Sequence, residues 1–326
     1  MNMESDHKAS VARARTLKEC CYGAWHSEPA RLAPWVAELT SLADDCARTP
    51  YADEIRGLAL WSAALADIAA GELTAATQRL EAAYAHLVDA GCPLDAAQTR
   101  IPLIMVLGLL GSFDDAHAQA SAACNAFMEL GDLQSAARVT LNLGSLCYSE
   151  DRYAEAAEHY SRASARFAQV GDREHSILAD IGRGDACSFL GDLDEAVALY
   201  RRAEYRARTR DFGVIRATAT QALAEVAMVR GAYQDALAGL DDAIRTFSAL
   251  GAPMLRMQAE RALAEAYVEL QLVKEAQNLL AAVDANLDAE SPARPWIALH
   301  LARLAAQQHD TAAAEALLAR AEASFI

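Results

Sequence analysis

The sequence predicts an all-α fold built from consecutive antiparallel helix pairs, an α-solenoid. Three observations support this prediction: aromatic residues are only 6% of the 326 residues, alanine is abundant, and a turn residue recurs every 20 positions. Small alanine side chains favour helices that approach closely, whereas a β-sandwich core needs more aromatic and β-branched residues. With 53% hydrophobic and 23% charged residues, the composition is typical of a chain that folds.

The 20-residue period defines the expected helices. The helix-breaking residues are Gly71, Gly91, Gly111, Gly131, Asp151, Gly171, Gly191, Asp211, Gly231 and Gly251. Glycine suits a helix end because it adopts a positive φ without strain, and Asp is among the next best tolerated residues. Between these turns lie stretches of about 19 residues with apolar side chains at helical spacing. We therefore expect helices of roughly five turns.

Two such helices form a unit of 40 residues. Seven pairs are expected, at 51–90, 91–130, 131–170, 171–210, 211–250, 251–289 and 290–326. The last pair is compressed, with its turn near His309. Residues 1–50 follow the period less well, and they predict a helix pair, broken at 27–29, that caps the N-terminal end of the stack.

One segment carries a family signature. The stretch NLGSLCYSEDRYAEAAEHYSRA (142–163) resembles the tetratricopeptide repeat, with Leu143-Gly144, Tyr153, Ala156, Tyr160 and Ala163 at the expected spacings. The resemblance covers about 51–326 and implies a right-handed superhelix whose concave groove binds partner proteins. The long 40-residue unit is similar to the repeat arrays of bacterial signalling proteins, such as large transcription activators and CHAT-type proteases.

The resemblance also implies which side chains line the groove. They are Leu58, Trp61, Leu65, Ile68, Ile101, Met105, Leu109, Arg138, Leu141, Tyr148, Asp185, Phe189, Glu225, Arg261, Glu265 and Glu269. The N-terminal half of this set is largely apolar and the C-terminal half is polar and acidic. An exposed apolar strip of this size requires a cover. The sequence leaves three covers open: residues 1–50, a second copy of the chain, or a partner segment with apolar anchors and basic residues. It also leaves open that these residues are ordinary inter-repeat core.

A charged pair interrupts the fourth unit. Arg183 stands where neighbouring repeats have leucine, and Asp180 lies one helical turn earlier. A charge at a packing position is costly unless it is paired. Either the two residues pair with each other, or they form a polar pocket that binds a small anion or an acidic side chain.

Composition and missing motifs exclude several functions. The 29 Lys and Arg against 45 Asp and Glu give a net charge of −16, which disfavours nucleic acid as a ligand. No secretory signal, no apolar run of about 18 residues and no CxxC pair among seven cysteines is present, so we expect a soluble, cytoplasmic protein. Nucleotide-binding and protease motifs are missing, and the histidines do not cluster in sequence with Cys or acidic residues, so no metal, cofactor or catalytic residue is expected.

The sequence therefore predicts a non-enzymatic scaffold that binds a partner protein or peptide in its groove. The alternative is a regulatory or sensor array of a bacterial signalling system, in which the groove holds an effector domain or a small ligand. Such a system would include a CHAT-type protease, a transcription activator or a cyclase. A homodimer formed through the apolar groove or the C-terminal end is a further expectation. An enzyme with an unrecognised active site is the third class.

Overall fold

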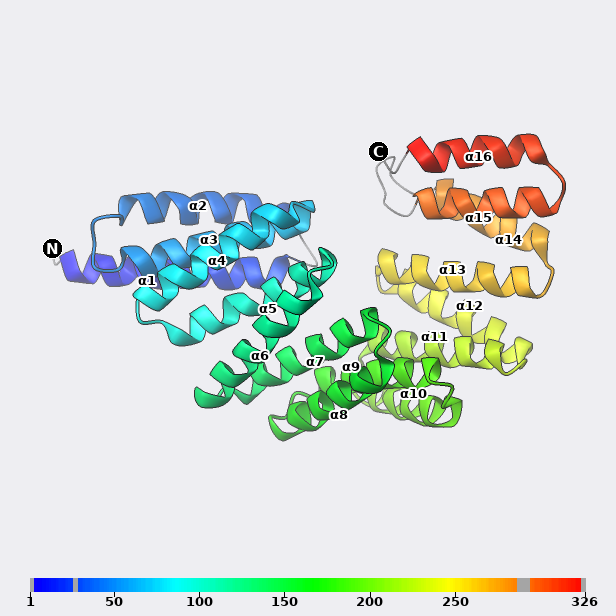
Figure 1. The fold of residues 1–326 in the computed structure, drawn as a ribbon, viewed down its shortest axis with the longest axis horizontal. Coiled ribbons are helices and arrows are strands. Elements are labelled where there is room, and N and C mark those ends of the chain that lie inside the picture. The colour runs from blue at the N-terminus through cyan, green and yellow to red at the C-terminus, as the bar shows by residue number, and fades with distance from the viewer. Residues whose placement is uncertain (1–2, 26–28, 286–293, 324–326) are drawn as a thin grey trace. The chain divides into compact units, whose positions relative to one another are not determined.

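The computed structural model describes residues 3–25, 29–285 and 294–323, and every regular element in these ranges is a helix. Sixteen α-helices and one short 3₁₀ helix (Pro29–Arg31) follow one another along this part of the chain (Figure 1). Helices that follow one another within a compact unit of the chain pack as antiparallel pairs. The predicted all-α solenoid architecture is confirmed.

The chain divides into two compact units, Met1–Ala186 and Cys187–Ile326. The first unit contains α1 (Met3–Ala24), α2 (Leu32–Asp45), α3 (Ala52–Ala70), α4 (Leu73–Asp89), α5 (Pro93–Leu109), α6 (Phe113–Glu129), α7 (Leu133–Ser149), α8 (Tyr153–Gln169) and most of α9 (Arg173–Phe189). The second contains α10 (Leu193–Arg208), α11 (Gly213–Val229), α12 (Tyr233–Ala249), α13 (Pro253–Glu269), α14 (Val273–Ala285), α15 (Arg294–Gln307) and α16 (Thr311–Ala323). Residues 27 and 28 of the expected break at 27–29, and the expected boundary at 289/290, lie outside the described residues, whereas Pro29 begins the 3₁₀ helix.

The helix ends follow the turn residues. Each of the eight glycines of the 20-residue period has a positive φ, and Asp151 and Asp211 adopt φ of 59° and 61°. Gln271 and His309 have the same left-handed conformation, which continues the pattern to the last pair. At Gly171, the next amide, Asp172 N–H, donates to the Phe167 carbonyl at 2.9 Å, as in a Schellman motif. Because each turn takes about three residues, helices α4 to α13 have 16 or 17 residues rather than the 19 expected.

The core of each pair contains alanines at fixed repeat positions and a larger side chain near the end of the second helix. Ala156 and Ala163 are fully buried, as are the alanines at the same positions of the other repeats from Ala76 to Ala243. Phe127, Phe167 and Phe247, which also share one repeat position, are fully buried near the ends of their helices. Alanine at the crossing lets two helices approach closely, and the aromatic ring fills the space where they diverge.

Candidate functional site

The first part of the expected groove is covered by the N-terminal helix. Helix α1 packs against α3, and Leu58, Trp61 and Leu65 are at most 1% exposed. The Tyr22 ring meets Trp61 edge-on with 5.8 Å between centroids, and Lys18 Nζ lies 4.2 Å from the Trp61 centroid. Among the three covers that the sequence left open, residues from 1–50 therefore lie on α3. These apolar residues are core, and they offer no open surface to a partner.

A pocket of about 590 Å³ opens between the next two first helices, α5 and α7. The expected groove residues Ile101, Met105, Leu109, Arg138 and Leu141 all line it. The remaining lining residues are Tyr22, Trp25, Pro102, Ile104, Gly108, Phe113, Asn142, Ser145, Leu146, Ser149 and His175. Tyr22 and Trp25 come from the N-terminal segment, which the repeat pattern alone did not place there.

The two walls of this α5–α7 pocket differ in chemistry. Helix α5 contributes apolar side chains, among them Ile104 and the half-buried Met105. Helix α7 contributes a polar stripe that includes Arg138, Asn142 and Ser145, at spacings of four and three residues. That spacing places the polar side chains on one face of the helix. A segment with an apolar side and a polar side would therefore contact both walls.

Arg138 is the charged group of the pocket. Its guanidinium is half-buried, and its Nε is buried without a hydrogen-bond partner. Among the described residues, no carboxylate lies within ion-pair distance of it. Its neighbour is the Tyr22 hydroxyl: burial raises the pKa of Tyr22, and the hydrogen bond and charge of Arg138 oppose that rise. A guanidinium without a counter-ion beside an apolar wall can pair with an anionic group.

A histidine that lines the pocket is held by the residue just before its helix and by an aromatic ring of the preceding helix. His175 Nδ1 lies 3.0 Å from Asp172 Oδ1, and its ring stacks on Phe167 at 5.2 Å between centroids. Burial alone would raise the pKa of Asp172, but hydrogen bonds from His175 and its charge outweigh this, so the pKa is lowered. The carboxylate therefore fixes the imidazole at the pocket rim.

The other expected residues of the first unit lie outside the pocket. Ile68 is half-buried and packs on the same core as Trp61. The ring of Tyr148 meets Tyr153 edge-on, with 5.3 Å between centroids. Asp180 is 3% exposed, and its carboxylate accepts a hydrogen bond from Ser164 Oγ at 2.8 Å. Arg183 and Asp185 are half-buried in α9, and neither they nor Asp180 line the pocket.

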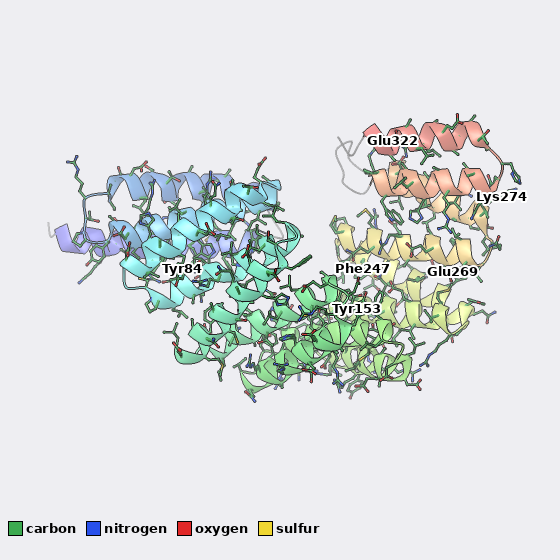
Figure 2. The ribbon with its side chains drawn as sticks, in the orientation of Figure 1. Tyr84, Tyr153, Phe247, Glu269, Lys274 and Glu322 are labelled. Carbon is green, nitrogen blue, oxygen red and sulfur yellow. The ribbon has the colours of Figure 1, made fainter. Side chains whose placement is uncertain are left out.

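Three of the four acidic residues expected in the groove belong to the second unit. Glu225 on α11 and Glu265 and Glu269 on α13 are all exposed, and Figure 2 shows Glu269 near the end of α13. Arg261, also exposed, lies with its guanidinium 5.4 Å from the Trp296 ring and lines a smaller pocket of about 210 Å³. Phe189, the last residue of α9, is 63% exposed. In this unit the expected residues present side chains to solvent, as a binding surface requires.

These features define a helical-repeat protein with a pocket in its first unit. Residues 135–208 match the family model of the tetratricopeptide repeat, and the chain has the fold of tetratricopeptide-repeat proteins. The STAND ATPase with a tetratricopeptide repeat sensor from Pyrococcus horikoshii is 13% identical, with a TM-score of 0.64 over 96% of this chain and 47% of that one. This chain thus spans about half the length of that protein.

Two further solved structures share the fold over nearly their whole length. A Rap protein complexed with Competence and Sporulation Factor is 12% identical, with a TM-score of 0.58 and coverage of 96% of this chain and 98% of that one. The apo form of the quorum sensor NprR from B. thuringiensis is 13% identical, with a TM-score of 0.59 and full coverage of both chains. A search of curated proteins gives no significant match. In the part of the chain that the structure describes, none of the helices combines the length and apolar character needed to cross a bilayer.

Proposed function

We propose that this chain is a non-enzymatic protein-interaction scaffold that binds a segment of a partner protein in the α5–α7 pocket. The observation that carries the proposal is the contrast between the pocket walls: an apolar wall on α5 faces a polar stripe on α7 that holds the half-buried Arg138. Helix-in-groove and extended-peptide recognition both use an apolar anchor beside a few fixed polar contacts.

The occupant that this chemistry favours is a short segment with a large apolar side chain next to a carboxylate. The apolar side chain would pack on Met105 and Ile104, and the carboxylate would pair with Arg138. A bidentate arginine–carboxylate contact that is partly shielded from water is stronger than one on an open surface. The sequence predicted basic residues in the partner. Such residues would suit the exposed Glu225, Glu265 and Glu269 of the second unit, and that pairing stays a proposal.

Similarity of fold supports the general class of function, and no more, because one fold hosts many functions. The Rap protein was solved with Competence and Sporulation Factor bound, and NprR is described as a quorum sensor. By analogy, we propose a regulatory role for this chain. We also place it in a reducing compartment such as the cytoplasm, since none of its seven cysteines forms a disulfide.

The test is a peptide selection followed by point variants. Peptides from a random phage-displayed library are selected on the intact chain, and the affinity of a selected peptide is measured by fluorescence polarisation. Arg138→Gln should weaken binding about 10- to 100-fold, because the loss of one charge-assisted bond costs about 1.5–3 kcal/mol. Met105→Asp should abolish binding, because it places a negative charge in the apolar wall, where it would repel the carboxylate of the peptide.

Matched controls keep this test specific. Arg162→Gln removes an exposed arginine that pairs only with Glu158 on its own helix, and Met254→Asp changes a methionine that is 60% exposed at the start of α13. Both should leave binding unchanged. Selected peptides without an acidic residue, or an unchanged affinity in Arg138→Gln with normal helicity, would contradict the proposal. Loss of a dimer in Met105→Asp, without peptide binding, would instead identify a second copy as the occupant.

A small ligand is the second candidate, because a pocket of about 590 Å³ lies in the size range of small-molecule sites. This is the sensor role that the sequence left as an alternative. A small carboxylic acid that raises the melting temperature of the intact chain, but not that of Arg138→Gln, would favour it over a peptide. Failure of both small acids and selected peptides to bind would reject both candidates.

A further inference from the structure

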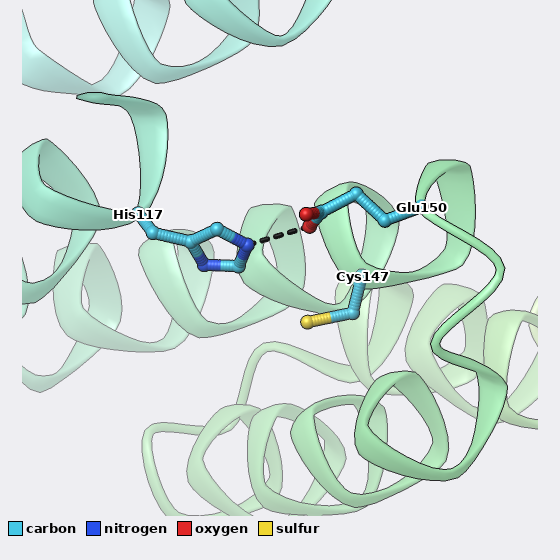
Figure 3. A group of neighbouring side chains, drawn as sticks. All are labelled: His117, Cys147 and Glu150. Atoms are coloured by element: carbon cyan, nitrogen blue, oxygen red, sulfur yellow. Dashed lines mark hydrogen bonds and ion pairs between the residues drawn. The ribbon is translucent and has the colours of Figure 1, made fainter. Parts of the chain in front are cut away.

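A second group of chemically active side chains lies where α6 and α7 meet, apart from the α5–α7 pocket. His117 on α6 faces Cys147 and Glu150 on and just after α7 (Figure 3). His117 Nε2 lies 2.6 Å from Glu150 Oε2, and one imidazole nitrogen, the thiol sulfur and a carboxylate oxygen all lie within 4.8 Å of one another. Cys147 is fully buried, and the other two side chains are half-buried.

These three residues coincide in one repeat only. Forty residues later, the positions of His117 and Glu150 are occupied by Ala157 and Leu190, although Cys187 stands at the position of Cys147. A buried Cys is a common core residue. The imidazole and the carboxylate, by contrast, depart from the other repeats: the position of His117 holds Thr77, Ala157, Val197 and Leu237, and the position of Glu150 holds Leu110, Leu190, Arg230 and Leu270.

Neither protonation state of His117 Nε2 satisfies both of its polar contacts, with Glu150 and with Arg152. Arg152 Nη1 lies 3.1 Å from the same His117 Nε2 and 3.4 Å from Glu150 Oε2. If Nε2 carries a proton it can donate to Glu150, but then it faces an N–H of Arg152. If Nε2 is unprotonated it can accept from Arg152, but then its lone pair faces the carboxylate. A cation placed between Nε2 and Oε2 would accept both lone pairs at once.

Arg152 also pairs with Glu155, and this contact would hold its side chain in place if a cation bound. Its Nε and Nη2 donate to the two carboxylate oxygens of Glu155 at 2.8 and 2.6 Å. This bidentate pair stays intact when Nη1 gives up its contacts with His117 and Glu150. The guanidinium can therefore move away from an incoming cation without losing its strongest bonds.

We propose that His117 Nε2, Cys147 Sγ and a Glu150 carboxylate oxygen bind a Zn²⁺ ion. A thiolate, an imidazole and a carboxylate are ligands that zinc accepts together, and hard cations such as Mg²⁺ avoid sulfur. Three protein ligands leave the fourth tetrahedral position to water. The Cys147 thiol loses its proton to solvent as the S–Zn bond forms. The proposal does not depend on peptide binding, since none of the three residues lines the α5–α7 pocket.

The test uses the intact, metal-free chain with Zn²⁺ and with Co²⁺ as a spectroscopic substitute. Competition with a chromogenic chelator should give one equivalent of bound Zn²⁺. Co²⁺ should produce a thiolate-to-metal charge-transfer band in the near ultraviolet. His117→Gln and Glu150→Gln, which change half-buried side chains, should each weaken Zn²⁺ binding about 100-fold or more, since even outer-shell partners contribute 10–100-fold. Cys147→Ser should remove the Co²⁺ band.

Two matched variants separate this site from other thiols and imidazoles. Cys187→Ser removes a buried thiol at the same repeat position, and His86→Gln removes an imidazole that pairs with Asp53 at 2.9 Å. Both variants should still bind one equivalent of Zn²⁺ and show the Co²⁺ charge-transfer band. The proposal is overturned if the native chain binds no equivalent of Zn²⁺, if the band persists in Cys147→Ser, or if folded His117→Gln and Glu150→Gln bind as tightly as the native chain.

Discussion

At the scale of single residues, the same apolar side chain can serve core or surface, and its neighbours decide which. Leu65 and Met105 occupy the same position of the 40-residue unit, yet Leu65 is fully buried in α3, which α1 covers, whereas Met105 lies in the wall of the pocket. Periodicity identifies the face of a helix and not what covers that face. A Leu65 variant would therefore report on folding, and Met105 is the residue that tests binding.

The carboxylate of Asp172 gives a residue-scale prediction about pH. Its pKa in the folded chain lies below the ordinary value of an aspartate, 3.8, so its ionised form favours folding. This contribution is present above about pH 4 and is lost as the pH falls through the lowered pKa. Asp172→Asn should lose about 1 kcal/mol of unfolding free energy near neutral pH, and the difference from the native chain should shrink toward pH 3.

Urea unfolding between pH 6 and pH 3 measures this difference. Asp132→Asn is the matched control, because Asp132 caps α7 one repeat earlier, where Ser135 replaces His175. A difference for Asp172→Asn that stays constant over the whole pH range would show that the His175 contact does not favour the ionised carboxylate.

At the scale of helices, close approach depends on glycines that face an aromatic ring. Tyr160 of α8 lies between Gly144 of α7 and Gly182 of α9, and a Cβ at either glycine would come within 2.8 Å of its ring carbons. The Tyr160 hydroxyl donates to Ser145 Oγ at 3.2 Å, which fixes the ring. Gly144, Ser145 and Tyr160 belong to the segment 142–163 that resembles the tetratricopeptide signature, and Gly182 lies in the next repeat unit, so the signature tyrosine fits against two neighbouring helices.

Gly144→Ala should therefore destabilise the chain although alanine is the better helix former. Overpacking a core destabilises a protein by about 1–3 kcal/mol, whereas the higher helix propensity of alanine stabilises it by up to about 1 kcal/mol. We therefore expect the free energy of unfolding to fall by about 1–2 kcal/mol. The measurement is denaturant unfolding followed by circular dichroism. Gly23→Ala in α1, where no atom lies within 4 Å of the added Cβ, is the control and should be neutral or stabilising. Equal effects of the two changes would show that Tyr160 repacks freely.

The sequence was a good guide to the helices and a partial guide to the sites. Glycine and Asp at positive φ mark helix ends locally, so the 20-residue period is visible in the sequence. The pocket joins residues from five helices, and Tyr22 reaches it from a segment outside the period. His117 and Cys147 come together across 30 residues with no spacing motif. Contacts of that kind depend on how helices pack, and local patterns do not contain this information.

At the scale of the whole molecule, the excess of negative charge is the dominant electrostatic feature. The net charge of −16 is distributed over a chain whose ion pairs lie mostly at the surface, such as Arg13 with Glu38 and Arg162 with Glu158. Exposed pairs of this kind contribute little to stability. We therefore expect the mutual repulsion of the unpaired carboxylates to outweigh the attraction within the pairs and to oppose binding to nucleic acid.

Salt should consequently stabilise this protein. The Debye length is about 30 Å at 0.01 M and about 8 Å at 0.15 M salt, so the repulsion acts over much of the molecule only at low salt. We expect the melting temperature to rise by a few degrees when NaCl increases from 0.01 to 0.15 M, with little further change at moderately higher salt. Differential scanning calorimetry at neutral pH measures this increase in melting temperature. The matched variant Glu204→Gln has one negative charge fewer, so its melting temperature should rise slightly less with salt. A melting temperature that falls with salt would mean that pairs such as Arg15 with Glu54 and Asp95, whose carboxylates are mostly buried, outweigh the repulsion.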